Sequence, residues 1–170
     1  LDESEEKRHC EALLHLPEQI ERILKNEELF KPVAERFSKA SSIFFIGRGL
    51  DYSISLEGSL KLKEISYIKS EAYAAGELKH GTISLIEPGT PVFAVATQPD
   101  LFEKTLGNIR EVKSRGAYVA ALVGEDCENA GEFSDVAIKV PRTLSEYMPS
   151  LNVVPLQLIA YFTAVERGCD

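Results

Sequence analysis

The sequence predicts an α/β domain in which a mostly parallel β-sheet lies between two layers of helices. Three observations point to this class. Short apolar runs rich in β-branched and aromatic residues recur along the chain, as in strands buried on both faces of a parallel sheet. Segments with helical periodicity separate these runs, so crossover helices join consecutive strands. Glycines close several of the runs, which is typical of strands that end in a tight turn.

The elements begin with a helical lead-in over residues 1–40, where apolar residues recur near helical spacing. The apolar run at residues 43–46 is the first strand, and an amphipathic helix over residues 51–70 follows it. Short elements and turns fill the region up to the next apolar run. Three further strands are expected at residues 91–97, 117–124 and 135–141.

Two more helices complete the pattern. One is expected to begin near Asp100 as its N-cap and to end at Gly116 as its C-cap. The other is the apolar closing helix of residues 149–168, with Pro155 near its start. Neither an internal repeat nor a linker interrupts the sequence, so residues 1–170 are interpreted as a single domain.

Composition excludes several classes of function. The net charge of -8 and a pI near 5.0 repel phosphate backbones and anionic membranes, so neither nucleic acid nor a membrane is an expected partner. No apolar run approaches the length of a membrane span. The three cysteines are widely spaced and lack a metal-ligand pattern, which favours reduced thiols in a cytoplasmic protein without a metal or other cofactor.

Two loops are candidate ligand sites because ligands of parallel sheets bind at the carboxyl ends of strands. "GRGLDY" after the first strand has Gly47 and Gly49, with Arg48 between them, but Tyr52 stands where a dinucleotide fingerprint requires a third glycine. NAD binding is therefore disfavoured. The loop of residues 97–100 has too few hydroxyls for a phosphate cup.

The helix of residues 51–70 carries the strongest functional signal. On a helical wheel, Glu57, Lys61 and Glu64 lie within an arc of about 60° between two apolar sectors, while a serine-rich sector forms the expected solvent face. Buried charges cost several kcal/mol per ion unless they are well paired. The cluster is therefore either a structural ion pair or a functional site, in which a carboxylate moves a proton between carbon atoms and Lys61 stabilises negative charge on oxygen.

The segment "GRGLDYSISLEGSLKLKEISYIKSEAYAAGELKHG", residues 47–81, closely resembles the second sugar isomerase (SIS) subdomain of the glutamine:fructose-6-phosphate amidotransferases. The resemblance continues more loosely from residue 43 to about residue 170, where "VVPLQLIAYFTAVERGCD" is similar to the closing helix of that family. It implies the SIS fold, a flavodoxin-like version of the predicted sandwich.

The resemblance also implies roles for individual residues. Glu64 matches the base that moves a proton between C1 and C2 as a ketose becomes an aldose, and Lys61 and Glu57 line the same site. His80, a loop histidine that would otherwise be taken as an inert surface residue, matches one that assists sugar ring opening from the neighbouring subunit. Residues 47–49 are expected to bind substrate, which would be fructose 6-phosphate on its way to glucosamine 6-phosphate.

The chain departs from the whole enzyme of that family. The family also has a glutaminase domain, a first SIS half whose serine and threonine loop holds the substrate phosphate, and a tail lysine that forms a Schiff base. We therefore expect this chain to be a domain or fragment that pairs as a homodimer, inactive on its own. Two alternatives stay open: a stand-alone phosphosugar-binding module, and half of a sugar-phosphate deaminase or deglycase.

Overall fold

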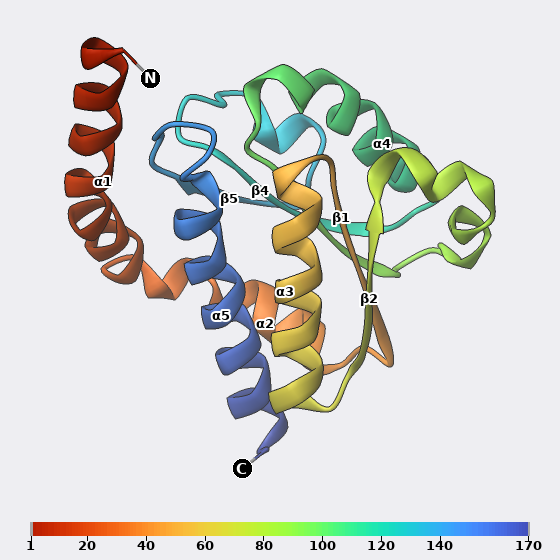
Figure 1. Ribbon diagram of the computed structural model, residues 1–170. Coiled ribbons are helices and arrows are strands. Elements are labelled where there is room, and N and C mark those ends of the chain that lie inside the picture. The colour runs from red at the N-terminus through yellow and green to blue at the C-terminus, as the bar shows by residue number, and fades with distance from the viewer. Residues whose placement is uncertain (1, 170) are drawn as a thin grey trace.

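The computed structural model describes residues 2–169 and has the predicted layers (Figure 1). A parallel sheet of five strands runs in the order β2-β1-β3-β4-β5. All four pairings are parallel. From β1, the chain adds β2 on one side and then β3, β4 and β5 on the other, so the strand order reverses between β1 and β3. The strands are β1 (Ser42–Gly47), β2 (Lys69–Ala74), β3 (Pro91–Ala96), β4 (Tyr118–Gly124) and β5 (Val136–Val140). The prediction of a parallel three-layer α/β sandwich is confirmed.

Two apolar cores lie on the two faces of the sheet, because side chains alternate between faces along each strand. Phe45 and Phe93 contribute to the first core, where their rings lie 5.6 Å apart between centroids. This core is covered by α2 (Lys31–Ser38), α3 (Leu50–Ser66) and α5 (Met148–Arg167). The second core lies under α4 (Phe102–Ser114) and the short helices η2 (Ala75–His80) and η3 (Thr82–Leu85).

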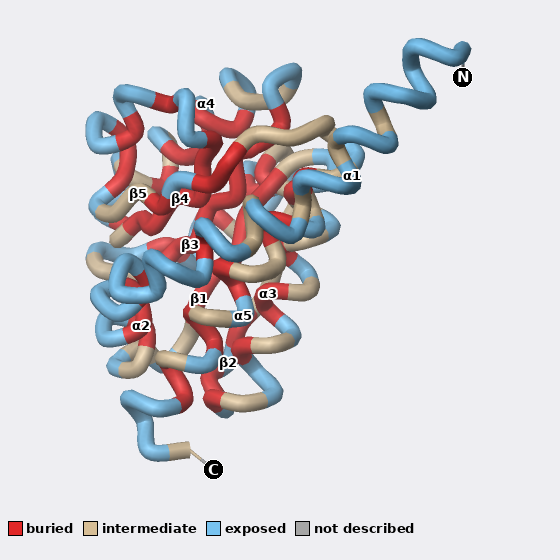
Figure 2. Tube along the Cα trace, turned by 90° about the vertical axis from the view of Figure 1, so that its left-hand side faces the viewer, coloured by how far each residue is buried: buried red, intermediate tan, exposed pale blue. Residues whose placement is uncertain are grey.

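The N-terminal helix α1 (Glu3–Leu24) is joined to α2 by the single turn η1 (Glu27–Leu29), so the lead-in is helical as expected. Asp2 caps α1 by accepting a hydrogen bond from the Glu5 amide, while the Glu5 side chain accepts one from the Asp2 amide. Ile23, near the end of α1, is its one fully buried residue. The first turns of α1 are exposed and extend beyond the rest of the domain (Figure 2).

The expected helix of residues 51–70 was too long. It ends at Ser66, where Tyr67 adopts a left-handed conformation with φ 60° and ends the helix. The chain then enters β2, a strand that the apolar pattern did not predict. This strand lies at the edge of the sheet and carries Lys69 and Glu71, so it lacks the continuous apolar run of the central strands.

The serine sector of α3 is buried, which corrects the expectation that it faces solvent. Ser55 and Ser66 are fully buried, and each hydroxyl donates to the carbonyl one turn earlier, at 2.7 and 2.6 Å. The Ser59 and Ser70 hydroxyls lie 3.1 Å apart between α3 and β2. Because these small side chains satisfy their own hydrogen bonds, the helix can pack closely on the sheet through them.

Two other expectations need correction. Asp100 is not an N-cap, since it lies in the short turn η4 (Pro99–Leu101) and α4 begins after it without a side-chain cap. The closing helix α5 is 20 residues long and apolar enough to span a membrane by composition, contrary to the prediction that no run has this length. Half of its apolar window is buried, and it packs against α2 and α3 as a core helix. Gly116, with φ 86°, follows α4 as predicted.

Candidate active site

The charged cluster lies on the outer face of α3. Lys61 Nζ is 2.6 Å from Glu64 Oε2 and 3.7 Å from Glu57 Oε1, the contacts expected for residues three and four apart on a helix. The hydrogen bond to Glu64, together with the charges of Glu64 and Glu57, raises the pKa of Lys61 above its usual value, although partial burial acts in the opposite direction. Lys61 is therefore an ammonium held between two carboxylates.

This cluster is half-exposed rather than buried. The side chains of Lys61, Glu57 and Glu64 retain 34%, 38% and 47% of their accessible surface. Ion pairs this exposed contribute roughly 1 kcal/mol or less to stability. The neighbouring Leu56 and Leu60, which belong to one of the two apolar sectors of the wheel, are also exposed, at 47% and 42%, so this sector does not pack on the core. The charges therefore interrupt an exposed apolar surface.

The glycine loop lies at the other end of α3. A Cβ on Gly47 would be 2.6 Å from the Asp51 backbone, and Gly49 has φ 56°, so both positions need glycine for the turn into the helix. Arg48 is held within the chain, because its Nε and Nη2 donate to Asn108 Oδ1 at 3.1 and 3.0 Å. Helical rise places Glu64 about 20 Å along α3 from this loop. The structure therefore does not bring residues 47–49 together with Glu64.

His80 is also separate from the cluster within this chain. It ends η2, which follows β2 and so lies at the carboxyl edge of the sheet, where α3 begins (Figure 1). Its side chain retains 75% of its accessible surface, and its Nε2 is 3.8 Å from Glu77 Oε2. Glu64, near the end of α3, lies toward the opposite edge. His80 and Glu64 of one copy therefore do not face one another.

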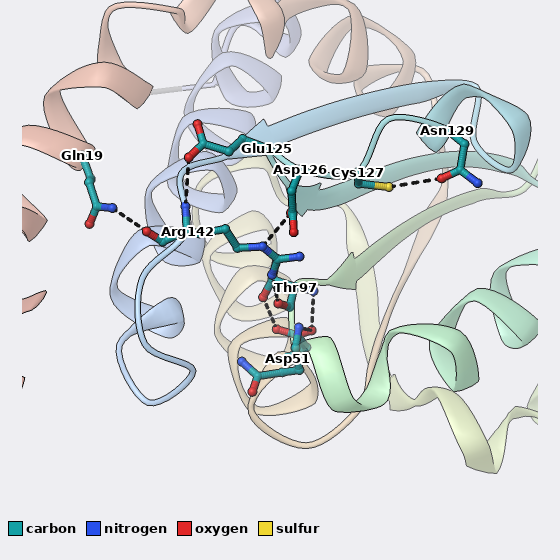
Figure 3. Close-up of polar contacts among 9 residues, drawn as sticks. Gln19, Asp51, Thr97, Glu125, Asp126, Cys127, Asn129 and Arg142 are labelled. Atoms are coloured by element: carbon teal, nitrogen blue, oxygen red, sulfur yellow. Dashed lines mark hydrogen bonds and ion pairs between the residues drawn. The ribbon is translucent and has the colours of Figure 1, made fainter. Parts of the chain in front are cut away.

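A buried polar network that the sequence analysis missed joins the first turn of α3, the segment after β3 and α5 (Figure 3). The Asp51 carboxylate accepts hydrogen bonds from the Thr97 amide at 2.7 Å, the Gln98 amide at 3.1 Å and the Thr97 hydroxyl at 2.6 Å. Asn152 Nδ2 donates to the Thr97 hydroxyl at 2.7 Å. Burial raises the pKa of Asp51, against the opposing effect of these hydrogen bonds and of the Arg142 charge.

Arg142 extends this network toward the surface. Its guanidinium donates to the Thr97 carbonyl and, at 2.7 Å, to Asp126 Oδ1 (Figure 3). The hydrogen bond from Arg142 lowers the pKa of Asp126. Arg142 and Asp126 line a cavity of about 450 Å³ beside Cys127, whose pKa is raised by burial. The only sequence signal for this network was an aspartate in the first turn of the helix after the glycine loop.

Fold and site together define a doubly wound, all-parallel α/β domain with a charged cluster on its first crossover helix. Residues 36–167 match the family described as the SIS domain. The chain belongs to this SIS domain family.

Similar proteins agree with this assignment. The chain is 54% identical over 158 residues to a glutamine–fructose-6-phosphate aminotransferase [isomerizing] of Caldanaerobacter subterraneus subsp. tengcongensis, covering 93% of this chain and 26% of that protein. The C-terminal domain of glucosamine-fructose-6-phosphate aminotransferase from Francisella tularensis superposes with a TM-score of 0.95 at 34% identity, over 100% of this chain and 48% of that one. A glucosamine-6-phosphate deaminase from Thermotoga maritima gives a TM-score of 0.66 at 28% identity, over 95% and 45%.

Proposed function

We propose that this chain is one half of the isomerase part of a glutamine–fructose-6-phosphate aminotransferase, and that Glu64 is its proton-transfer base. The chain spans about a quarter of the length of the relative with that activity and about half of the similar C-terminal domain. The observation that carries the proposal is the Lys61–Glu64 pair of 2.6 Å, half-exposed on an apolar surface that the core does not use.

The chemistry fits a carboxylate beside an ammonium. In the conversion of fructose 6-phosphate to glucosamine 6-phosphate, a proton leaves C1 and returns to C2. The Glu64 carboxylate takes that proton and then gives it back, a role worth about 10² to 10⁴ in rate. Lys61 stabilises the negative charge that develops on oxygen between the two transfers. Glu57, 3.7 Å from Lys61, holds the ammonium from its other side and acts as a positioning residue.

The proposed partners follow from the same surface. We propose that the first isomerase half packs over Leu56 and Leu60. A glutaminase domain would supply the ammonia. His80 would act in the site of a second copy, which requires a homodimer; its high exposure and its distance from Glu64 support this arrangement. Residues 47–49 are proposed to shape the turn into α3 rather than to touch the sugar bound at Glu64. The three free cysteines fit a cytoplasmic enzyme.

A second candidate is half of a sugar-phosphate deaminase, favoured by the 28% identity to the Thermotoga maritima protein. Both candidates use the same proton transfer, so they differ in whether ammonia is consumed or released. Steady-state assays of the full-length enzyme separate them. An aminotransferase forms glucosamine 6-phosphate from fructose 6-phosphate and glutamine, whereas a deaminase releases ammonia from glucosamine 6-phosphate supplied alone. A phosphosugar-binding module would turn over neither substrate.

Glu64→Gln in the full-length enzyme tests the role of Glu64. Glutamine keeps the shape of the side chain but cannot accept the proton, so the isomerisation rate should fall about 10²-fold or more with little change in KM. Lys63→Gln is the matched control, because Lys63 is an exposed neighbour outside the cluster. A near-normal rate with a markedly lower thermal midpoint would refute the catalytic assignment and favour a structural ion pair.

A further inference from the structure

The strand order determines where ligands bind in this fold. In doubly wound sheets the ligand crevice opens at the carboxyl ends of the two strands between which the order reverses. In this chain those strands are β1 and β3. The position is bounded by the glycine loop, by the first turn of α3 and by Thr97 and Gln98, which follow β3. Free backbone amides and a helix N-terminus at such a position favour an anion, commonly a phosphate.

An anion from the chain itself already lies at this position. The Asp51 carboxylate receives the amides of Thr97 and Gln98 and the Thr97 hydroxyl, and Asn152 Nδ2 lies 3.3 Å from the same carboxylate. Asp51 is only 1% exposed, and Thr97 and Asn152 are fully buried. The donors that would hold an external anion are therefore consumed by an internal one.

The start of α3 closes the crevice as well. A Cβ on Gly47 would lie 2.6 Å from the carbonyl group of Asp51, so the first turn of the helix sits directly on the end of β1. Arg142, the nearest cation of the network, is committed to the Thr97 carbonyl and to Asp126. The donors of Thr97, Gln98, Asn152 and Arg142 at the switch point are thus used within the chain.

We infer that Asp51 determines the ligand specificity of this half by acting as a built-in anion that keeps phosphate away from its switch point. The inference rests on the proposed function only in assigning the substrate phosphate to the other isomerase half. It predicts a latent anion site, made of the Thr97 and Gln98 amides, the Thr97 hydroxyl and the Asn152 amide, which opens when the carboxylate is removed.

Two measurements on the 170-residue chain test the inference. First, inorganic phosphate is titrated into the wild-type chain at constant ionic strength while the amide NMR signals of Thr97 and Gln98 are followed. We expect no saturable change, and a saturable change would overturn the inference. Second, Asp51→Ala is titrated with formate, which matches the lost carboxylate in size and charge. Formate at about ten times its Kd should lower the unfolding constant about 11-fold.

Asp100→Ala is the matched control, because it removes one carboxylate from the exposed turn beside Gln98 and leaves the network intact. Formate stabilisation no greater for Asp51→Ala than for this control would overturn the latent site. If Asp51→Ala does not fold, the wild-type phosphate titration decides alone. Neither experiment reads isomerase activity, so a failure here is distinct from a failure of the Glu64 assignment.

Discussion

Replacing Gly124 with alanine should displace Arg142. Gly124 ends β4, and a Cβ at this position would lie 2.2 Å from both Cζ and Nε of Arg142. A methyl group and the guanidinium cannot occupy this space together. Because the guanidinium is the far end of a flexible side chain, it will swing away, and the steric cost itself will be small.

The cost of Gly124→Ala is therefore the loss of the hydrogen bonds of Arg142. The pair with Asp126 is largely exposed on the carboxylate side, at 63%, and should contribute roughly 1 kcal/mol or less. Loss of the bond to the carbonyl of buried Thr97 leaves that acceptor unpaired, which costs about 1–3 kcal/mol. The sum is about 1–4 kcal/mol, equivalent to a midpoint lower by roughly 2–16 °C in a domain of this size.

Urea unfolding and thermal unfolding of the variant measure this effect. Gly107→Ala is the control, because Gly107 is exposed in α4 with nothing within 4 Å of an added Cβ, and alanine there should stabilise by about 0.5–1 kcal/mol. In an Arg142→Ala background, Gly124→Ala should become nearly neutral, since the group it displaces is gone. An equal cost in both backgrounds would show that the reasoning about Arg142 is wrong.

Three further predictions follow from other parts of the chain. Burial alone would raise the pKa of Asp135, but hydrogen bonds from Lys113 and from the Val119 amide outweigh it and lower that pKa. The carboxylate therefore stabilises the fold above about pH 4, and the stability difference between wild type and Asp135→Asn should vanish as the pH falls below that value. Leu62→Ala, at a fully buried position between α3 and the first core, should cost about 2–5 kcal/mol in urea unfolding. The isolated chain should show no fructose 6-phosphate isomerisation in a coupled assay, and clear turnover would contradict the half-site proposal.

The central fold was predictable because its strands are apolar on both faces. The runs that became β1, β3 and β4 were recognised for this reason. The strand β5 lies at the other edge of the sheet and exposes Lys139, but it was recognised because three of its five residues are β-branched and apolar. The edge strand β2 was missed, since a strand with one open side needs no apolar run and here carries Lys69 and Glu71. The serine face of α3 was misjudged because composition does not show that a hydroxyl can satisfy itself on its own helix and be buried.

The charged cluster was predictable from spacing, because helix geometry alone brings Glu57, Lys61 and Glu64 together. The Asp51 network was not, since its members come from four separate segments and meet only when the sheet forms. The wheel also placed the cluster in a buried face. Whether an apolar sector packs on its own core or on a partner depends on tertiary contacts that periodicity does not contain.

The position of His80 and Glu64 at opposite ends of the domain bears on genetic complementation. In the proposed homodimer each site draws these two groups from different subunits, so subunits carrying Glu64→Gln and subunits carrying His80→Ala are each inactive alone. Co-expressed, they form some mixed dimers in which one site receives both defects and the other receives none. Random pairing of equal amounts gives about half mixed dimers, and so restores about a quarter of full activity. Two inactive alleles would then support growth together, because Glu64 and His80 lie toward opposite edges of the sheet and so serve different sites of the dimer.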